Sequence, residues 1–106
     1  MVVEIEDLIR AIGEGKVIIT DHADEEAEND ALSFDEVYFS VVHGEVIEEY
    51  PEDKPYPSSL VYGETFGGDQ VHSVWAYNEG SEFAVVVTVY RPDQARWGPD
   101  WKTRRK

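Results

Sequence analysis

Four polar residues in the second half of the chain have types and spacing that could support acid–base chemistry. His72 lies in one β-prone run, and Thr88, Tyr90 and Arg91 follow at the end of the next. Histidine titrates near neutral pH, and an arginine can hold a phosphate by two hydrogen bonds. This set suits metal-free cleavage of RNA, in which the 2′-hydroxyl attacks the adjacent phosphate. The same residue types also fit half-buried sheet positions whose polar tips are hydrogen-bonded.

A second histidine, His22, is predicted at the start of a helix, where the helix dipole disfavours protonation of the ring. A neutral imidazole there could accept a proton, bind a metal, or simply cap or pack the helix. His22, His72 and a carboxylate would suit a two-histidine metal site. However, the chain has neither H-x-x-x-H nor H-x-H spacing, so we predict no metal and no cofactor. His43 precedes Gly44 at a predicted helix end, where its charge favours the helix dipole.

The C-terminal segment interleaves tryptophans with basic side chains. The pattern is formed by Trp97, Trp101, Lys102, Arg104 and Arg105. This pattern is typical of surfaces that stack single-stranded nucleic acid. It equally fits a terminal segment that two tryptophans anchor to the core. We predict that Thr88, Trp97, Arg104 and Arg105 bind a ligand, and that any contact with RNA runs through this segment.

Acidic side chains dominate the rest of the chain. The sequence has 9 Lys and Arg against 23 Asp and Glu, for a net charge of −14. Residues 1–90 hold 3 basic and 21 acidic residues, a net −18, whereas residues 91–106 hold 6 and 2, a net +4. A field this negative repels phosphate over most of the surface. We therefore predict neither DNA wrapping nor binding to anionic membranes, although the acidity could serve solubility alone.

Length and composition place the chain among small soluble proteins. Its 106 residues, 42% of them hydrophobic, predict one ordered domain over residues 1–106. The absence of cysteine excludes disulfides, thiolate zinc sites and a cysteine nucleophile. No apolar run approaches the ~18 residues of a membrane span. No basic region followed by an apolar stretch marks a secretory signal, so we expect a cytoplasmic protein.

Helical patterns occupy the first 44 residues. An apolar stripe at helical spacing is formed by Ile5, Leu8, Ile9 and Ile12. Asp21 is predicted to cap a weak helix over residues 22–30. Ser33 and Glu36 form the capping box of the next helix, which Gly44 ends.

Alternating patterns follow Gly44. They predict strands at residues 45–50, 60–66, 71–77 and 83–90. The run 16–20 is either an edge strand or an extended connector. Strand 83–90 is apolar on both faces, which predicts a central position. Helices followed by strands indicate an α+β fold, with two to three N-terminal helices packed on a four-stranded antiparallel sheet.

The predicted turns decide which polar side chains share a face. A three-residue loop at 78–80 would pair His72 with Val86 and place its side chain on the same face as Thr88 and Tyr90. A loop of different parity would put His72 and Tyr90 on opposite faces.

The turn before this hairpin decides what lies above the histidine. A two-residue loop at residues 67–68 would set Gly63 opposite His72 and leave space above the ring. We therefore predict a shallow pocket between the helical layer and the sheet, lined by His72 and Tyr90.

Several motifs occur together between residues 19 and 105. They are ITDHA at 19–23, GEVIEEYPEDKPYPSSL at 44–60, HSV at 72–74, TVYRP at 88–92, Trp97 and the pair Arg104-Arg105. In these motifs the chain resembles a bacterial domain family of unknown function that is distantly related to the RelE/ParE-like toxins. The resemblance implies two or three helices followed by a curved antiparallel sheet. RelE-like relatives are often metal-independent ribonucleases, whereas ParE-like relatives act otherwise.

The chain departs from this family at two positions of the second helix. Members usually carry arginine where this chain has Glu26 and Asp30. The exchange inverts charge that could hold a phosphate. We therefore predict a non-catalytic or degenerate domain that binds a protein partner. The alternatives are a metal-independent ribonuclease that uses His22, His72, Tyr90 and Arg91, and a small-molecule or metal-dependent enzyme.

Overall fold

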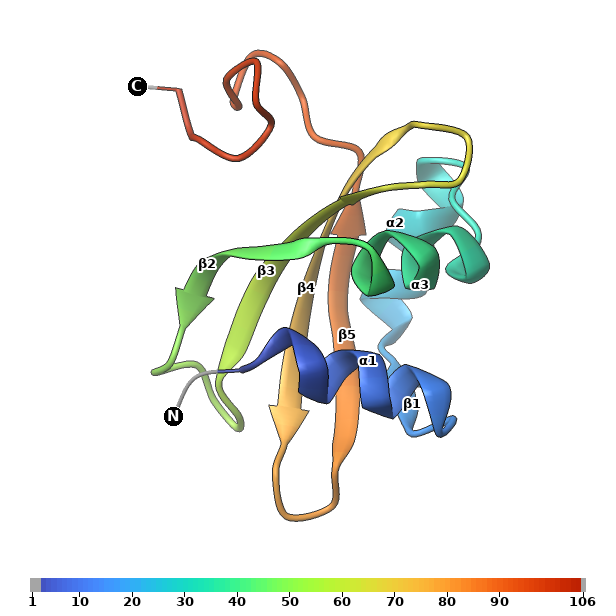
Figure 1. Ribbon diagram of the computed structural model, residues 1–106, viewed down its shortest axis with the longest axis vertical. Helices are drawn as coiled ribbons and strands as arrows, with labels where there is room; N and C mark the ends of the chain where they lie inside the picture. Colours follow the sequence, from blue (N-terminus) through green and yellow to red (C-terminus); the bar gives the residue numbers. More distant parts are fainter. Residues whose placement is uncertain (1–2, 106) are drawn as a thin grey trace.

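Three helices and a five-stranded sheet make up residues 3–105, which are the part of the chain described by the computed structural model (Figure 1). In chain order the elements are α1 (Ile5–Gly13), β1 (Val17–Ile19), α2 (Asp21–Asn29), α3 (Phe34–Val42), β2 (Glu45–Tyr50), β3 (Ser58–Glu64), β4 (Gln70–Asn78) and β5 (Phe83–Tyr90). The predicted α+β class is confirmed, but the helices do not all precede the strands, because β1 lies between α1 and α2. The four predicted strands all form.

The sheet has one strand more than predicted. Its order is β1-β5-β4-β3-β2, in which β2 to β5 pair antiparallel and β1 pairs parallel to β5. The run 16–20 therefore contains an edge strand, from Val17 opposite Ala84 to Ile19 opposite Val86. A strand of three residues is too short to show alternation, so its sequence cannot separate it from a connector. The predicted central position of β5 is confirmed.

The helix starts follow capping chemistry. The Ser33 side chain accepts from the Glu36 backbone N–H at 3.1 Å, and Glu36 accepts from the Ser33 N–H at 3.0 Å, which is the predicted capping box of α3. The cap of α2 is Thr20, not Asp21 as predicted. Its hydroxyl accepts from the Ala23 N–H at 3.0 Å and donates to the Val86 carbonyl at 3.0 Å. This second bond ties the start of α2 to β5.

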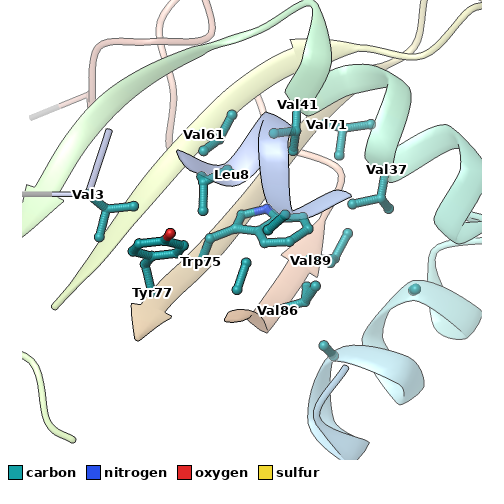
Figure 2. Close-up of a cluster of buried hydrophobic side chains, with 14 of the residues drawn as sticks. Val3, Leu8, Val37, Val41, Val61, Val71, Trp75, Tyr77, Val86 and Val89 are labelled. Carbon is teal, nitrogen blue, oxygen red and sulfur yellow. The ribbon is translucent and has the colours of Figure 1, made fainter. Parts of the chain in front are cut away.

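One face of the sheet carries the hydrophobic core. Leu8 of α1 and Val41 of α3 cover Trp75, which is fully buried and donates its indole N–H to Ser73 at 2.8 Å (Figure 2). Helix α3 approaches β3 closely at Gly63, where an added Cβ would lie 1.9 Å from the Ser40 carbonyl oxygen. The core thus fixes which face of each strand points at the helices.

The segment that follows β5 covers the part of the opposite face around His72. Because side chains alternate along a strand, His72 points away from the helices when Trp75 and Val71 point toward them. Residues 91–105 leave β5 and curl back past the end of the sheet, drawn in orange to red at the top of Figure 1. Trp97 and Trp101 of this segment contact His72. The predicted pocket between helices and sheet is therefore wrong, because His72 lies on the other side.

The β4–β5 hairpin differs from the prediction but reaches the predicted outcome. Its loop has four residues, 79–82, because Asn78 pairs with Phe83. This loop alone would pair His72 with Val89 and separate it from Tyr90. A β-bulge restores the register: Val87 is extra, and His72 then pairs with Tyr90. The predicted shared face is therefore correct, although the predicted loop and the pairing with Val86 are wrong.

The β3–β4 turn is also one residue longer than predicted. The Thr65 backbone N–H donates to the Asp69 carbonyl at 2.9 Å, which encloses residues 66–68. Tyr62, not Gly63, therefore lies opposite His72. The Tyr62 ring fills the predicted space, edge-on to the imidazole with centroids 5.8 Å apart.

Candidate functional site

His72 is held by hydrogen bonds on both of its ring nitrogens. Its Nε2 lies 2.7 Å from the Trp101 carbonyl oxygen, and its Nδ1 lies 3.1 Å from the Tyr90 hydroxyl. A carbonyl can only accept, so Nε2 carries the hydrogen and Nδ1 accepts from Tyr90 when the ring is neutral. The side chain is 0% exposed. No nitrogen of this ring is available to a substrate in this conformation.

Aromatic rings enclose the imidazole on the remaining sides. Trp97 meets it edge-on with centroids 4.4 Å apart, and the rings of Tyr62 and Tyr90 lie at 5.8 Å and 5.3 Å. Burial lowers the pKa of His72, because a charged ring loses its hydration; the Trp101 carbonyl and Glu48 oppose this shift. The ring is therefore neutral at pH 7.

Tyr90 connects His72 to a pocket of about 390 Å³ on this side of the molecule. The pocket is lined by Glu26, Tyr90, Arg91, Asp93, Arg96, Trp97 and Arg104. Burial raises the pKa of the Tyr90 hydroxyl, so it stays protonated and donates to His72. This pocket brings together four of the eight residues that the sequence predicted to be functional, namely Tyr90, Arg91, Trp97 and Arg104.

Arg104 forms a solvent-exposed ion pair with Glu48. Its guanidinium donates twice to the Glu48 carboxylate, at 2.7 Å and 2.9 Å, and lies 4.7 Å from the centre of the Trp97 ring. Tyr50 donates to the same carboxylate at 2.5 Å. The Arg104 hydrogen bonds lower the pKa of Glu48, whereas burial and the bond to Glu48 raise the pKa of Tyr50 to about 12. The network fastens the C-terminal segment to β2.

Arg91 is hydrogen-bonded to the residues that follow α2. Its backbone N–H donates to the Asp30 carboxylate at 2.8 Å, and its side chain donates to the carbonyls of Asp30 and Ala31 at 2.7 Å and 3.3 Å. Asp69 lies 3.4 Å from the same guanidinium. Asp30, one of the two positions at which the chain departs from the resembled family, is thus a structural partner of Arg91.

The other predicted site residues occupy varied places. His22 is exposed near the N-terminal end of α2 and does not line the pocket beside Tyr90. Thr88 is half-buried next to the bulge, opposite Val74. Arg105 donates to the Gln94 carbonyl at 2.5 Å, within the C-terminal segment. The structure therefore groups His72, Tyr90, Trp97 and Arg104 and leaves out His22.

Sequence reasoning missed the residues that hold this group in place. The Trp101 contact uses a backbone carbonyl in a residue with a φ of 64°, and main-chain acceptors leave no mark in a sequence. Glu48 is one of many acidic residues, so its role shows only through its contact with Arg104. Tyr62 could have been found from the correct β3–β4 register.

A second pocket, of about 510 Å³, lies where α3 ends and β3 turns into β4. It is lined by Phe39, His43, Gly44, Glu45, Tyr62, Gly63, Glu64, Thr65, Phe66 and Gly68. His43 is the C-cap residue of α3, at the predicted helix end, with its Nδ1 3.1 Å from the Phe39 carbonyl and its ring 4.3 Å from the Phe39 ring. No reasoning from the sequence singled out Phe39 or Phe66.

The described residues contain neither a metal-binding cluster nor a membrane-spanning helix. Within residues 3–105, no group of three or more His, Asp or Glu side chains is arranged to hold a metal ion. In the same part of the chain, no helix has the length and apolar character needed to cross a membrane.

Comparison with known proteins identifies one family. A family described as Domain of unknown function (DUF4258) matches residues 19–91, from the end of β1 to Arg91. No curated protein and no solved structure matches the chain. The matched range includes His22, His72, Tyr90 and Arg91, and it ends before Trp97, Trp101 and Arg104. Since the match spans more than half of the 106 residues, the chain belongs to the DUF4258 family.

Proposed function

We propose that this domain is a non-catalytic binding module whose partner is a basic segment of another protein. The observation that carries the proposal is the state of His72: it is fully buried, and both ring nitrogens are hydrogen-bonded within the chain. A general acid or base must reach the proton that it transfers. His72 instead fastens the C-terminal segment to the sheet.

The charges around Tyr90 also argue against phosphate chemistry. Arg104 is paired with Glu48, and Arg91 is bonded to Asp30. Glu26 and Asp93 add two carboxylates to the lining of the same pocket. Of the three arginines that line the pocket, Arg96 alone has no side-chain hydrogen bond or ion pair within residues 3–105. An RNA phosphate entering here would therefore lose hydration and gain one arginine rather than a clamp of several.

The surface outside this pocket favours a cationic partner. Residues 1–90 carry a net charge of −18, and α2 exposes Asp24, Glu25 and Glu28 to solvent. A field of one sign steers oppositely charged partners and speeds their association. The proposed partner is therefore a lysine- or arginine-rich protein segment.

A metal-independent ribonuclease is the alternative function. The resemblance to RelE/ParE-like toxins and the grouping of Tyr90, Arg96 and Trp97 at one pocket favour it. This alternative requires Trp101 to release His72, so that the ring can exchange a proton with the RNA. It also leaves His22 without a place in the site.

RNA cleavage and peptide binding distinguish these two functions. We expect the purified protein to leave RNA intact at acidic, neutral and alkaline pH, and its induction in a bacterial host not to slow growth. We expect it to bind a lysine-rich peptide but not the glutamate-rich peptide of equal length, as measured by fluorescence anisotropy. RNA cleavage that is abolished in Tyr90→Phe would overturn the binding proposal in favour of the nuclease.

A further inference from the structure

The pocket at the end of α3 exposes two phenylalanine rings. Phe66 is 69% exposed and Phe39 is 36% exposed. The rings meet edge-on with their centroids 5.7 Å apart. The β3–β4 loop that carries Phe66 lies beside α3 (Figure 1). Exposed apolar groups that cluster in this way mark interaction surfaces more often than single exposed side chains do.

The loop holds Phe66 in a fixed position. Thr65 is buried, and its hydroxyl oxygen accepts from the backbone N–H groups of Gly67 at 3.2 Å and Asp69 at 3.1 Å. Gly68 has a φ of 88°, which only glycine adopts readily. The Phe66 ring is therefore carried by a hydrogen-bonded turn. A partner that contacts this ring would pay little conformational entropy for ordering the loop.

Two carboxylates line the same pocket. They belong to Glu45, at the start of β2, and Glu64, at the end of β3. Within residues 3–105, Glu64 forms no ion pair. Aromatic faces attract cations through the ring quadrupole, and a nearby carboxylate adds Coulomb attraction. Phenylalanine rings beside an unpaired carboxylate thus form a receptor for a cationic side chain.

The chain already places one of its own cations at the rim of this pocket. The Lys102 ammonium lies 3.1 Å from the Glu45 carboxylate and 5.9 Å from the centre of the Tyr62 ring. Glu45 and Tyr62 both line the pocket. Lys102 therefore already pairs with one aromatic ring and one carboxylate of this pocket, and Phe66 and Glu64 supply a second aromatic ring and a second carboxylate.

The alternative occupants fit this pocket less well. An anion, including nucleic acid, would meet Glu45 and Glu64. A purely apolar ligand would strip water from these carboxylates without compensation. A second copy of the chain would bring a net charge of −14 against an acidic surface.

We infer that the pocket formed by Phe39, Phe66 and Glu64 receives one lysine or arginine side chain of the basic partner segment. This inference rests on the proposed function and assigns it a specific anchor. The aliphatic stem of the incoming side chain packs on the two phenylalanine rings, and its charged head reaches Glu64.

The test measures binding of a fluorescein-labelled peptide of alternating lysine and glycine. The second peptide is identical except that its lysines are acetylated, which removes the charge and keeps the stem. We expect Phe66→Ala to weaken binding of the lysine peptide about 2- to 30-fold, the range expected of a cation–aromatic contact. Phe66 is mostly exposed, so this change leaves the core intact. The acetylated peptide should bind weakly to both proteins.

The matched control separates a specific anchor from general attraction. Glu64→Gln and Glu28→Gln remove the same charge, one inside the pocket and one on the exposed face of α2. Glu64→Gln should weaken binding several-fold more than Glu28→Gln. Equal effects of the two changes, with no effect of Phe66→Ala, would overturn the anchor but leave the binding module standing. If the unmodified protein does not bind the lysine peptide even at low salt, the proposed function itself fails.

Discussion

The two ring nitrogens of His72 form hydrogen bonds within the protein, one as donor and one as acceptor. In an enzyme, such nitrogens would instead transfer a proton to or from the substrate. The ring bonds the Trp101 carbonyl on one side and Tyr90 on the other. The residue type and spacing fit both a catalytic and a structural histidine. Only the burial of the ring and its hydrogen-bond partners distinguish the two roles. Tyr90 beside His72 was predictable from strand register. The Trp101 carbonyl was not, because it depends on the path of an irregular segment.

The neutral state of His72 predicts a pH dependence of stability. Burial places its folded-state pKa below the ordinary value of 6.5, so the unfolded chain binds a proton more readily than the folded one. Its contribution is complete above pH 6.5 and declines as the pH falls below this value toward the folded-state pKa. His72→Gln, which can still donate to Trp101 and accept from Tyr90, should show a smaller loss of stability across this interval.

Urea unfolding of both proteins at a series of pH values measures the difference. Comparing wild type with His72→Gln cancels the contributions of the 23 acidic residues and of the exposed His22 and His43, which both proteins share. Parallel pH profiles would contradict the assignment of a depressed pKa to the buried ring.

At the scale of elements, the structure differs from the predicted one where single residues are inserted. Local patterns predicted the three helices and β2 to β5, because each buries a periodic apolar face. The spacing of apolar residues does not reveal an extra residue in a strand, such as Val87 in β5. The bulge at Val87 shifts the strand register by one residue, which offsets the longer loop between β4 and β5. Nor does it reveal β1, whose three residues are stabilised by pairing with β5.

The close approach of α3 to β3 makes Gly63 the most sensitive junction between these layers. In Gly63→Ala, the new Cβ would overlap the Ser40 carbonyl oxygen, which belongs to the helix backbone and cannot rotate away. We expect the free energy of unfolding to fall by about 1–3 kcal/mol, as for other overpacked core positions. Gly13→Ala is the matched control, because an added Cβ at the end of α1 meets no atom within 4 Å. A Gly63→Ala protein as stable as Gly13→Ala would show that the layers can separate without cost.

For the whole molecule, the uneven charge has two consequences that respond oppositely to salt. The carboxylates of residues 1–90, with a net charge of −18, repel one another within the folded chain. The same carboxylates attract a basic partner. The C-terminal segment, with net +4, offsets part of this repulsion by pairing Arg104 with Glu48 and Lys102 with Glu45. The exposed ion pairs are worth little individually, so repulsion among the carboxylates dominates the balance.

Raising the salt concentration should therefore stabilise the free protein and weaken its binding to the lysine peptide. At physiological ionic strength the Debye length is about 8 Å, so added salt screens carboxylates spread over the surface. We expect the melting temperature to rise by a few degrees from low to physiological salt, while the Kd for the peptide increases. Glucose at matched osmolality, which leaves charge unscreened, controls for the general effect of cosolutes. A melting temperature that falls with salt would mean that the ion pairs of the C-terminal segment outweigh the repulsion, and the binding surface would then be far less negative than the sequence implies.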